Sequence, residues 1–148
     1  MKIAIASDHA GFEQKQLLLK HLADAGHNVT DLGPENDSRV DYPDFAQRVA
    51  EAVSRGCVDR GILVCGTGIG MAISANKVSG VRAVNVTNVE FAKLSREHND
   101  SNILCLSGRF VDVEENIRCV DAFLETDFAG GRHEARVKKM MALEHADE

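Results

Sequence analysis

The sequence contains no tryptophan, one tyrosine, Tyr42, and two prolines in 148 residues. A nucleic-acid platform built from stacked aromatic rings is therefore not expected. No apolar run is long enough to cross a bilayer as a helix, and the apolar start at residues 3–6 is too short for a signal peptide. We expect no nucleic-acid partner, no membrane partner and a cytoplasmic location.

Positive charge is also scarce, because 17 lysines and arginines stand against 23 aspartates and glutamates, for a net charge of −6. This balance argues against a general polyanion binder but leaves room for one local basic pocket. The four cysteines, at positions 57, 65, 105 and 119, show neither C-x-x-C spacing nor a zinc pattern. Two of them lie in apolar runs typical of buried strands, so we expect reduced thiols.

The chain does contain a regular alternation of short apolar runs and amphipathic segments, and its length suits a single domain over residues 1–148. The predicted strands are residues 3–6, 29–32, 61–65, 81–86 and 103–106, and the predicted helices are 12–25, 43–56, 71–78, 89–97 and 113–124, with a helical tail from residue 130. Strands that alternate with helices form a parallel sheet covered on both faces. The predicted fold class is α/β, a three-layer αβα doubly wound sandwich around a five-stranded parallel sheet.

Ligands of such sheets bind beyond the carboxyl ends of the strands. In this chain those ends carry Asp8 and His9, the loop 66–70, Thr87 with Asn88, and residues 107–109. Because the unusual polar residues gather at these ends, we expect the functional site there.

The segment 65–70, with the sequence CGTGIG, is the most unusual of these ends. Its glycines permit a tight turn that points successive N–H groups at one spot, and a helix follows. A P-loop, a dinucleotide fingerprint and a cysteine-phosphatase loop would each need a different residue where Met71 stands. The segment is either an anion-binding nest or a plain strand-to-helix turn. Cys65 is accordingly either a base or nucleophile, or a small core residue.

Five further side chains admit two interpretations. Asp8 either caps the next helix or binds a sugar hydroxyl, with His9 meeting an anion. His98, which we place between a helix and the last strand, is either solvated or a proton carrier. Arg132 and Arg136 share a helix face that is either a solvated basic surface or a phosphate clamp. The tail that carries them lies beyond the last strand, so we expect it to reach a neighbouring subunit.

Seven segments together resemble the ribose-5-phosphate isomerase type B family, which includes the galactose-6-phosphate isomerase subunits. They are residues 7–12, 41–43, 65–70, 75–77, 82–83, 95–100 and 130–133, and they span nearly the whole chain in the family's order. The resemblance implies a Rossmann-like or flavodoxin-like sheet and the interconversion of ribose 5-phosphate and ribulose 5-phosphate through an enediolate. It also implies no metal, no cofactor, and a homodimer or tetramer with a shared site.

By position, the resemblance assigns Cys65 as the base, Thr67 as its partner and His98 as the residue that opens the furanose ring. The N–H groups of residues 66–70 correspond to the oxyanion site. The implied substrate contacts are Asp8, His9, Tyr42, Gly66, Gly68, Ile69, Gly70, Asn99, Arg109, Arg132 and Arg136. Asp8 and Asn99 match contacts to sugar hydroxyls, whereas His9 and the three arginines match phosphate ligands. One branch of the family carries glutamate at the position of Met71; this chain, with Cys65, falls in the cysteine branch.

Three alternatives stay open. A hexose-6-phosphate isomerase, of the allose or galactose type, would differ in the length of its pocket. A non-catalytic sugar-phosphate sensor would keep the glycine loop and the arginines but would not need Cys65 and His98 together. A metal-dependent isomerase would lose its activity in EDTA.

Overall fold

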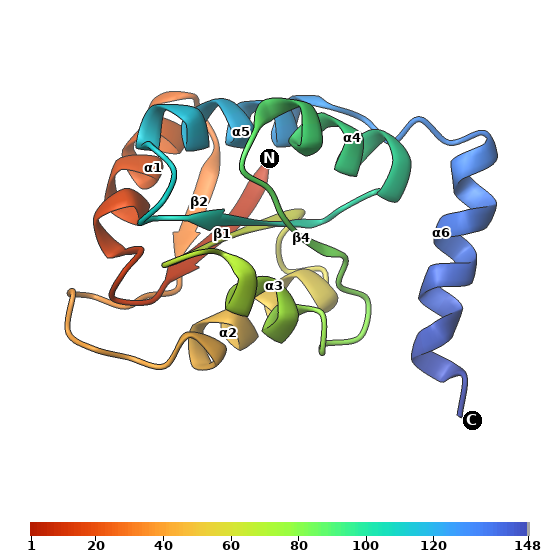
Figure 1. The fold of residues 1–148 in the computed structure, drawn as a ribbon, viewed down its shortest axis with the longest axis horizontal. Coiled ribbons are helices and arrows are strands. Elements are labelled where there is room, and N and C mark those ends of the chain that lie inside the picture. The colour runs from red at the N-terminus through yellow and green to blue at the C-terminus, as the bar shows by residue number, and fades with distance from the viewer. Residues whose placement is uncertain (148) are drawn as a thin grey trace.

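The computed structural model describes residues 1–147, and its elements alternate as the apolar pattern predicts (Figure 1). The strands are β1 (Lys2–Ser7), β2 (Asn28–Asp31), β3 (Arg60–Cys65), β4 (Ala83–Asn85) and β5 (Ile103–Ser107). The helices are α1 (Phe12–Asp24), α2 (Tyr42–Ser54), α3 (Ile69–Ala75), α4 (Val89–Asn99), α5 (Val113–Glu125) and α6 (Arg132–Ala142), and the short 3-10 helix η1 (Leu143–His145) follows. The predicted α/β class is confirmed.

The five strands are parallel and lie in the order β2-β1-β3-β5-β4. The last strand in the chain therefore lies inside the sheet, between β3 and β4. Cys65, at the end of β3, stands opposite Ser107, at the end of β5. Because β1, β3 and β5 are neighbours, the loops that follow their carboxyl ends meet at one edge of the sheet.

Helices α1, α4 and α5 cover one face of the sheet, and α2 and α3 cover the other (Figure 1). Alternate strand residues point to opposite faces. In β3, Ile62 and Val64 pack under the first group of helices, whereas Leu63 and Cys65 pack under the second. This alternation places the Cys65 side chain on the face covered by α3, whose first residues form the glycine loop.

Helix α1 buries Leu18 and Leu22, as its apolar stripe predicts, but it also buries Lys15 completely. The Lys15 ammonium lies 2.8 Å from a carboxylate oxygen of Asp31 and donates to the carbonyl of Pro34 at 2.8 Å. A buried cation needs such partners, since an unpaired buried charge is costly. Lys15 thereby holds the chain that leaves β2, which leads toward the functional edge.

Helix α4 begins as expected, because the Asn88 side chain accepts a hydrogen bond from the N–H of Phe91 at 2.8 Å. The helix continues to Asn99, two residues beyond the predicted end. The placement of His98 between a helix and a strand is therefore wrong: His98 and Asn99 form the last turn of α4. Asp100 adopts a left-handed conformation there and ends the helix.

Helix α6 stands apart from the sheet and its covering helices, on the side where α4 ends (Figure 1). Its contacts to the rest of the chain include a ring stack between His133 and His98 and a bond from Arg82 to Met141. The Glu144 carboxylate in η1 also accepts hydrogen bonds from Ser79 and Gly80. In residues 1–147, none of the helices combines the length and the apolar character that a membrane span requires.

Candidate active site

The loop after β3 places a backbone donor on the Cys65 sulfur. The N–H of Gly68 donates to Sγ at 3.2 Å, and the side chain is almost completely buried. Gly68 has a φ of 83°, and a Cβ there would lie 2.3 Å from the Asn85 amide nitrogen. Only glycine therefore fits the turn. The loop geometry thus fixes a backbone donor on the Cys65 sulfur.

The other cysteines lie in different surroundings. Burial raises the pKa of the Cys105 thiol far above its ordinary value and raises that of Cys119 to about 11. Cys57 is exposed, and all four thiols are free. Cys105 and Cys119 therefore act as small apolar core residues, whereas Cys57 does not.

Two of the N–H groups predicted to bind an oxyanion are used within the loop itself. Gly68 donates to Cys65, and Ile69 donates to the Thr67 hydroxyl oxygen at 3.1 Å. The N–H groups of Gly70 and Met71 find no acceptor within residues 1–147. The Thr67 hydroxyl, which accepts from Ile69, keeps its own proton for donation. The loop thus offers a sulfur base, a hydroxyl donor and free amide donors within a few residues.

Neighbouring segments hold the loop in place. The Ser107 hydroxyl donates to the carbonyl of Gly66 at 2.7 Å, and the N–H of Arg109 donates to the same carbonyl at 3.2 Å. A Cβ on Gly70 would lie 2.7 Å from the Tyr42 ring, so this ring packs directly on the glycine. Tyr42 and Arg109 are therefore brought to the loop, as the resemblance implies.

Asp8 and His9 border the same edge from the end of β1. One Asp8 oxygen accepts from the N–H of Gly11 at 3.0 Å, and the side chain is buried. Gly11 is itself the N-cap of α1, so Asp8 does not cap the helix as one interpretation had it. The N–H of Val40 donates to His9 Nδ1 at 3.3 Å, so the neutral ring carries its proton on Nε2. Asp8, His9, Arg39 and Tyr42 line a cavity of about 570 Å³.

A second hollow, of about 690 Å³, begins on the other side of Thr67 and Ile69 and includes Phe110. The side chains of Ile69 and Phe110 are 53% and 77% exposed. The first cavity suits a sugar phosphate better, because it is lined by His9 and Arg39. The charged residues of the second are mostly acidic (Asp112, Glu114 and Glu115, with Arg118), and its exposed apolar side chains are typical of a contact surface.

The remaining predicted residues lie at the opposite edge. His98 and Asn99 end α4, and the His98 ring stacks on His133 with 4.3 Å between centroids and 16° between planes. Arg132 and Arg136 lie on α6 and are exposed. Burial, together with His98 and the two arginines, lowers the pKa of His133. This end of the molecule is a cationic surface with two stacked imidazoles.

The predicted residues around Cys65 and those around His98 are separated by the length of the strands. Helix α4 runs back from the carboxyl edge, and β5 starts only four residues after Asn99. The five residues of β5 rise by about 3.3 Å each, so the edges are at least roughly 13 Å apart. Within one chain, the structure brings together Asp8, His9, Tyr42, Cys65, Gly66, Thr67, Gly68, Ile69, Gly70 and Arg109. It does not bring His98, Asn99, Arg132 and Arg136 to them.

Sequence reasoning missed two residues of these groups. Arg39 lines the cavity beside His9, and its nearness in sequence to the motif 41–43 was the available signal. His133 stacks on His98, and its position next to Arg132 was the corresponding signal. Among residues 1–147, no cluster of three or more histidine, cysteine and carboxylate side chains is placed to hold a metal ion.

A parallel sheet with a glycine loop and a thiol after the central strand, flanked by imidazole and guanidinium groups, defines a doubly wound α/β protein. A family model described as ribose/galactose isomerase matches residues 3–140. The chain therefore belongs to the ribose/galactose isomerase family.

Individual relatives are similar to this chain along nearly its full length. Ribose-5-phosphate isomerase B of Escherichia coli is 46% identical over 143 residues, which cover 97% of this chain and 96% of the relative. The solved structure of ribose-5-phosphate isomerase B from Clostridium thermocellum superposes with a TM-score of 0.98 at 47% identity and covers 100% of both chains. The Mycoplasma genitalium enzyme, solved with bound ribulose-5-phosphate, gives 0.94 at 48% identity and covers 98% of this chain and 97% of that one.

Proposed function

We propose that the chain interconverts ribose 5-phosphate and ribulose 5-phosphate through an enediolate, with Cys65 as the base. The observation that carries this proposal is the Cys65 sulfur, held by a backbone N–H at the functional edge of the sheet. It is supported by relatives near 50% identity named ribose-5-phosphate isomerase B, one of which was solved with ribulose-5-phosphate bound.

In the direction from aldose to ketose, the Cys65 thiolate removes the proton from C2 of the open-chain sugar. Negative charge develops on O1, which accepts hydrogen bonds from the free amide donors of the loop. One such donor contributes roughly 3–4 kcal/mol in a site of this kind. The thiol returns the proton to C1, while O1 gains one proton and the O2 hydroxyl loses one, so that the protons balance. Thr67 lies beside the base with its hydroxyl proton available for these oxygens.

Substrate binding follows from the groups around the cavity. Asp8 has one oxygen bound to Gly11 and the other available for a sugar hydroxyl. His9 presents Nε2–H, because Val40 occupies its other nitrogen, and a phosphate oxygen accepts well from such a donor. Fixing the phosphate at one end of the sugar lets a single base reach both C1 and C2.

The site is shared between two copies of the chain. His98, Asn99, Arg132 and Arg136 lie at the edge opposite Cys65, too far away to contact the same pentose phosphate in one subunit. Ile69, Ile73 and Phe110 stand exposed around the functional edge, where a second copy would bury them. A partner of this kind places its His98 as the ring opener and its arginines as the phosphate clamp. Light scattering is expected to give a dimer or a dimer of dimers; a fully active monomer would contradict a shared site.

Turnover tests the reaction directly. The purified chain is expected to convert ribose 5-phosphate to ribulose 5-phosphate after exhaustive EDTA treatment, and allose 6-phosphate and galactose 6-phosphate are measured beside it. Binding of ribose 5-phosphate without turnover would support a sensor and contradict the proposal. Faster turnover of a hexose phosphate would transfer the proposal to that substrate.

Residues 1–148 act as a single isomerase domain, since the family model spans residues 3–140. The four free thiols fit the reducing conditions of the cytoplasm.

A further inference from the structure

Asp100 directly follows the two α4 residues that the proposed site uses, His98 and Asn99. Its φ is 50°, and it is the one non-glycine residue with a positive φ in residues 1–147. Glycine is the usual residue for such a helix end, whereas aspartate is tolerated there. An aspartate at this position therefore indicates that its carboxylate makes a contact that glycine could not make.

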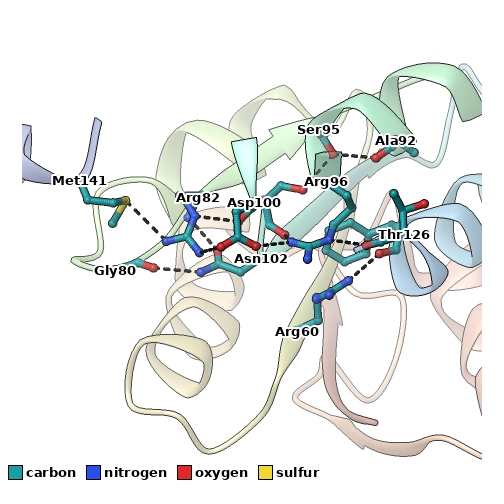
Figure 2. Close-up of polar contacts among 12 residues, drawn as sticks. Arg60, Gly80, Arg82, Ala92, Ser95, Arg96, Asp100, Asn102, Thr126 and Met141 are labelled. Atoms are coloured by element: carbon teal, nitrogen blue, oxygen red, sulfur yellow. Dashed lines mark hydrogen bonds and ion pairs between the residues drawn. The ribbon is translucent and has the colours of Figure 1, made fainter. Parts of the chain in front are cut away.

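The Asp100 carboxylate lies between two guanidinium groups (Figure 2). Arg96 Nη1 donates to Oδ1 at 2.8 Å, and Arg82 Nη2 lies 3.4 Å from Oδ2. Arg82 Nε also donates to the Asp100 carbonyl at 2.7 Å. The Arg96 side chain is only 5% exposed, so it requires a nearby counter-charge.

Each arginine also fixes a second segment. Arg96 donates to the carbonyls of Ser101 and Thr126, which join the end of α4 to the approach to β5 and to the end of α5. Arg82 reaches the Met141 sulfur on α6 at 3.5 Å (Figure 2). Through Arg82, the Asp100 carboxylate therefore connects the end of α4 to α6.

We propose that Asp100 is a positioning residue, which fixes the last turn of α4 so that His98 and Asn99 reach the substrate of the partner subunit. The inference rests on the proposed function, in which His98 opens the furanose ring. Asp100 itself contacts no reacting atom. A displacement of about 1 Å at such a distance from the chemistry can lower a rate by roughly 100-fold.

Two variants test this role. Asp100→Asn keeps the size of the side chain and tolerates the left-handed conformation but removes the charge. Asp100→Gly fits the same backbone without any side chain, and it replaces the first variant in the test if that variant does not fold. Two reactions are followed. Turnover of ribose 5-phosphate requires ring opening, whereas exchange of the C1 protons of ribulose 5-phosphate in D2O requires only the base, because this ketose carries its phosphate on O5 and stays open.

We expect D100N to lose roughly 10- to 100-fold in kcat/KM for ribose 5-phosphate. At saturating ribulose 5-phosphate, proton exchange should stay within about twofold of the wild-type rate, because the base is untouched and saturation offsets a weaker Asn99 contact. His98→Gln is expected to show the same split. Asp31→Asn is the matched structural control, since Asp31 also neutralises a buried cation, Lys15, but on β2. It should lower the Tm without separating the two reactions.

A parallel loss of both reactions in D100N, like that expected from any general loss of structure, would overturn the positioning role, as would wild-type rates for both. The split in H98Q without a split in D100N would overturn the role of Asp100 alone. Normal turnover of ribose 5-phosphate by H98Q would instead overturn the proposed function of His98, and this inference with it.

Discussion

The two edges of the sheet hold their functional groups by different means. At the carboxyl edge, contacts to the main chain hold the groups: a backbone N–H binds the Cys65 sulfur, and the Tyr42 ring packs on the backbone of Gly70. At the amino edge, ionic side chains do it, with Asp100 between Arg82 and Arg96. Geometry set by the backbone tolerates changes of charge but not of volume, whereas geometry set by ion pairs behaves in the opposite way.

The largest expected effect is at the carboxyl edge. Cys65→Ala removes the base, and general-base catalysis contributes about 10²- to 10⁴-fold, so kcat should fall by that factor. Binding of ribulose 5-phosphate, measured by calorimetry, should change little. Cys105→Ala is the matched control, because Cys105 packs on the same face of the sheet. Turnover that persists in C65A would show that the base is another residue.

At the amino edge, Arg136→Gln should raise KM for ribose 5-phosphate and leave kcat nearly unchanged. A hydrogen bond to a charged group contributes about 1.5–3 kcal/mol, which corresponds to roughly a 10- to 100-fold rise in KM. Lys138→Gln on the same helix is the control, because Lys138 is exposed and paired with Glu134 at 3.3 Å. Equal KM values for the two variants would remove Arg136 from the phosphate site.

A third test uses volume in place of charge. Gly70→Ala would place a Cβ 2.7 Å from the Tyr42 ring, and overpacking of this kind costs about 1–3 kcal/mol. Gly66→Ala meets its nearest atoms at an ordinary 3.5 Å. In G70A the Tm should therefore fall and KM should rise, whereas both should change little in G66A. Equal Tm values would mean that the Tyr42 ring moves away at no cost.

The smallest effect concerns pH. The folded pKa of His133 lies below its ordinary value, so between the two values the unfolded chain binds more protons. Stability is therefore lost as the pH falls through the ordinary histidine range near 6.5, and it is regained as the pH rises. His133→Asn should reduce this slope in urea unfolding at a series of pH values. An identical slope in both proteins would place the acid sensitivity elsewhere.

The fold was readable from the sequence because the apolar runs alternate so regularly with amphipathic segments. The short run at 103–106 did not reveal that β5 inserts between β3 and β4, since a parallel strand looks the same at any position in a sheet. The end of α4 was also misplaced, because Asp100 ends the helix in a conformation usually taken by glycine. Long-range partners such as Asp31 for Lys15 left no local signal.

In the candidate site, too, local features were predictable and long-range arrangement was not. Residues 65–70 form one local turn, so its N–H groups and its thiol were predictable together. The sequence did not show that two of these N–H groups are used internally, by Cys65 and Thr67. It also did not show that His98 lies at the opposite edge from Cys65, because that separation depends on the direction in which α4 runs.

The shared site is tested most directly by mixing two inactive variants. In a dimer of one C65A subunit and one H98Q subunit, one site lacks both groups and the other keeps both. Random reassociation gives half mixed dimers, each with one of its two sites intact, so a shared site predicts about a quarter of the wild-type activity. A mixture no more active than the separate variants would place Cys65 and His98 in the same subunit's site and contradict a shared site.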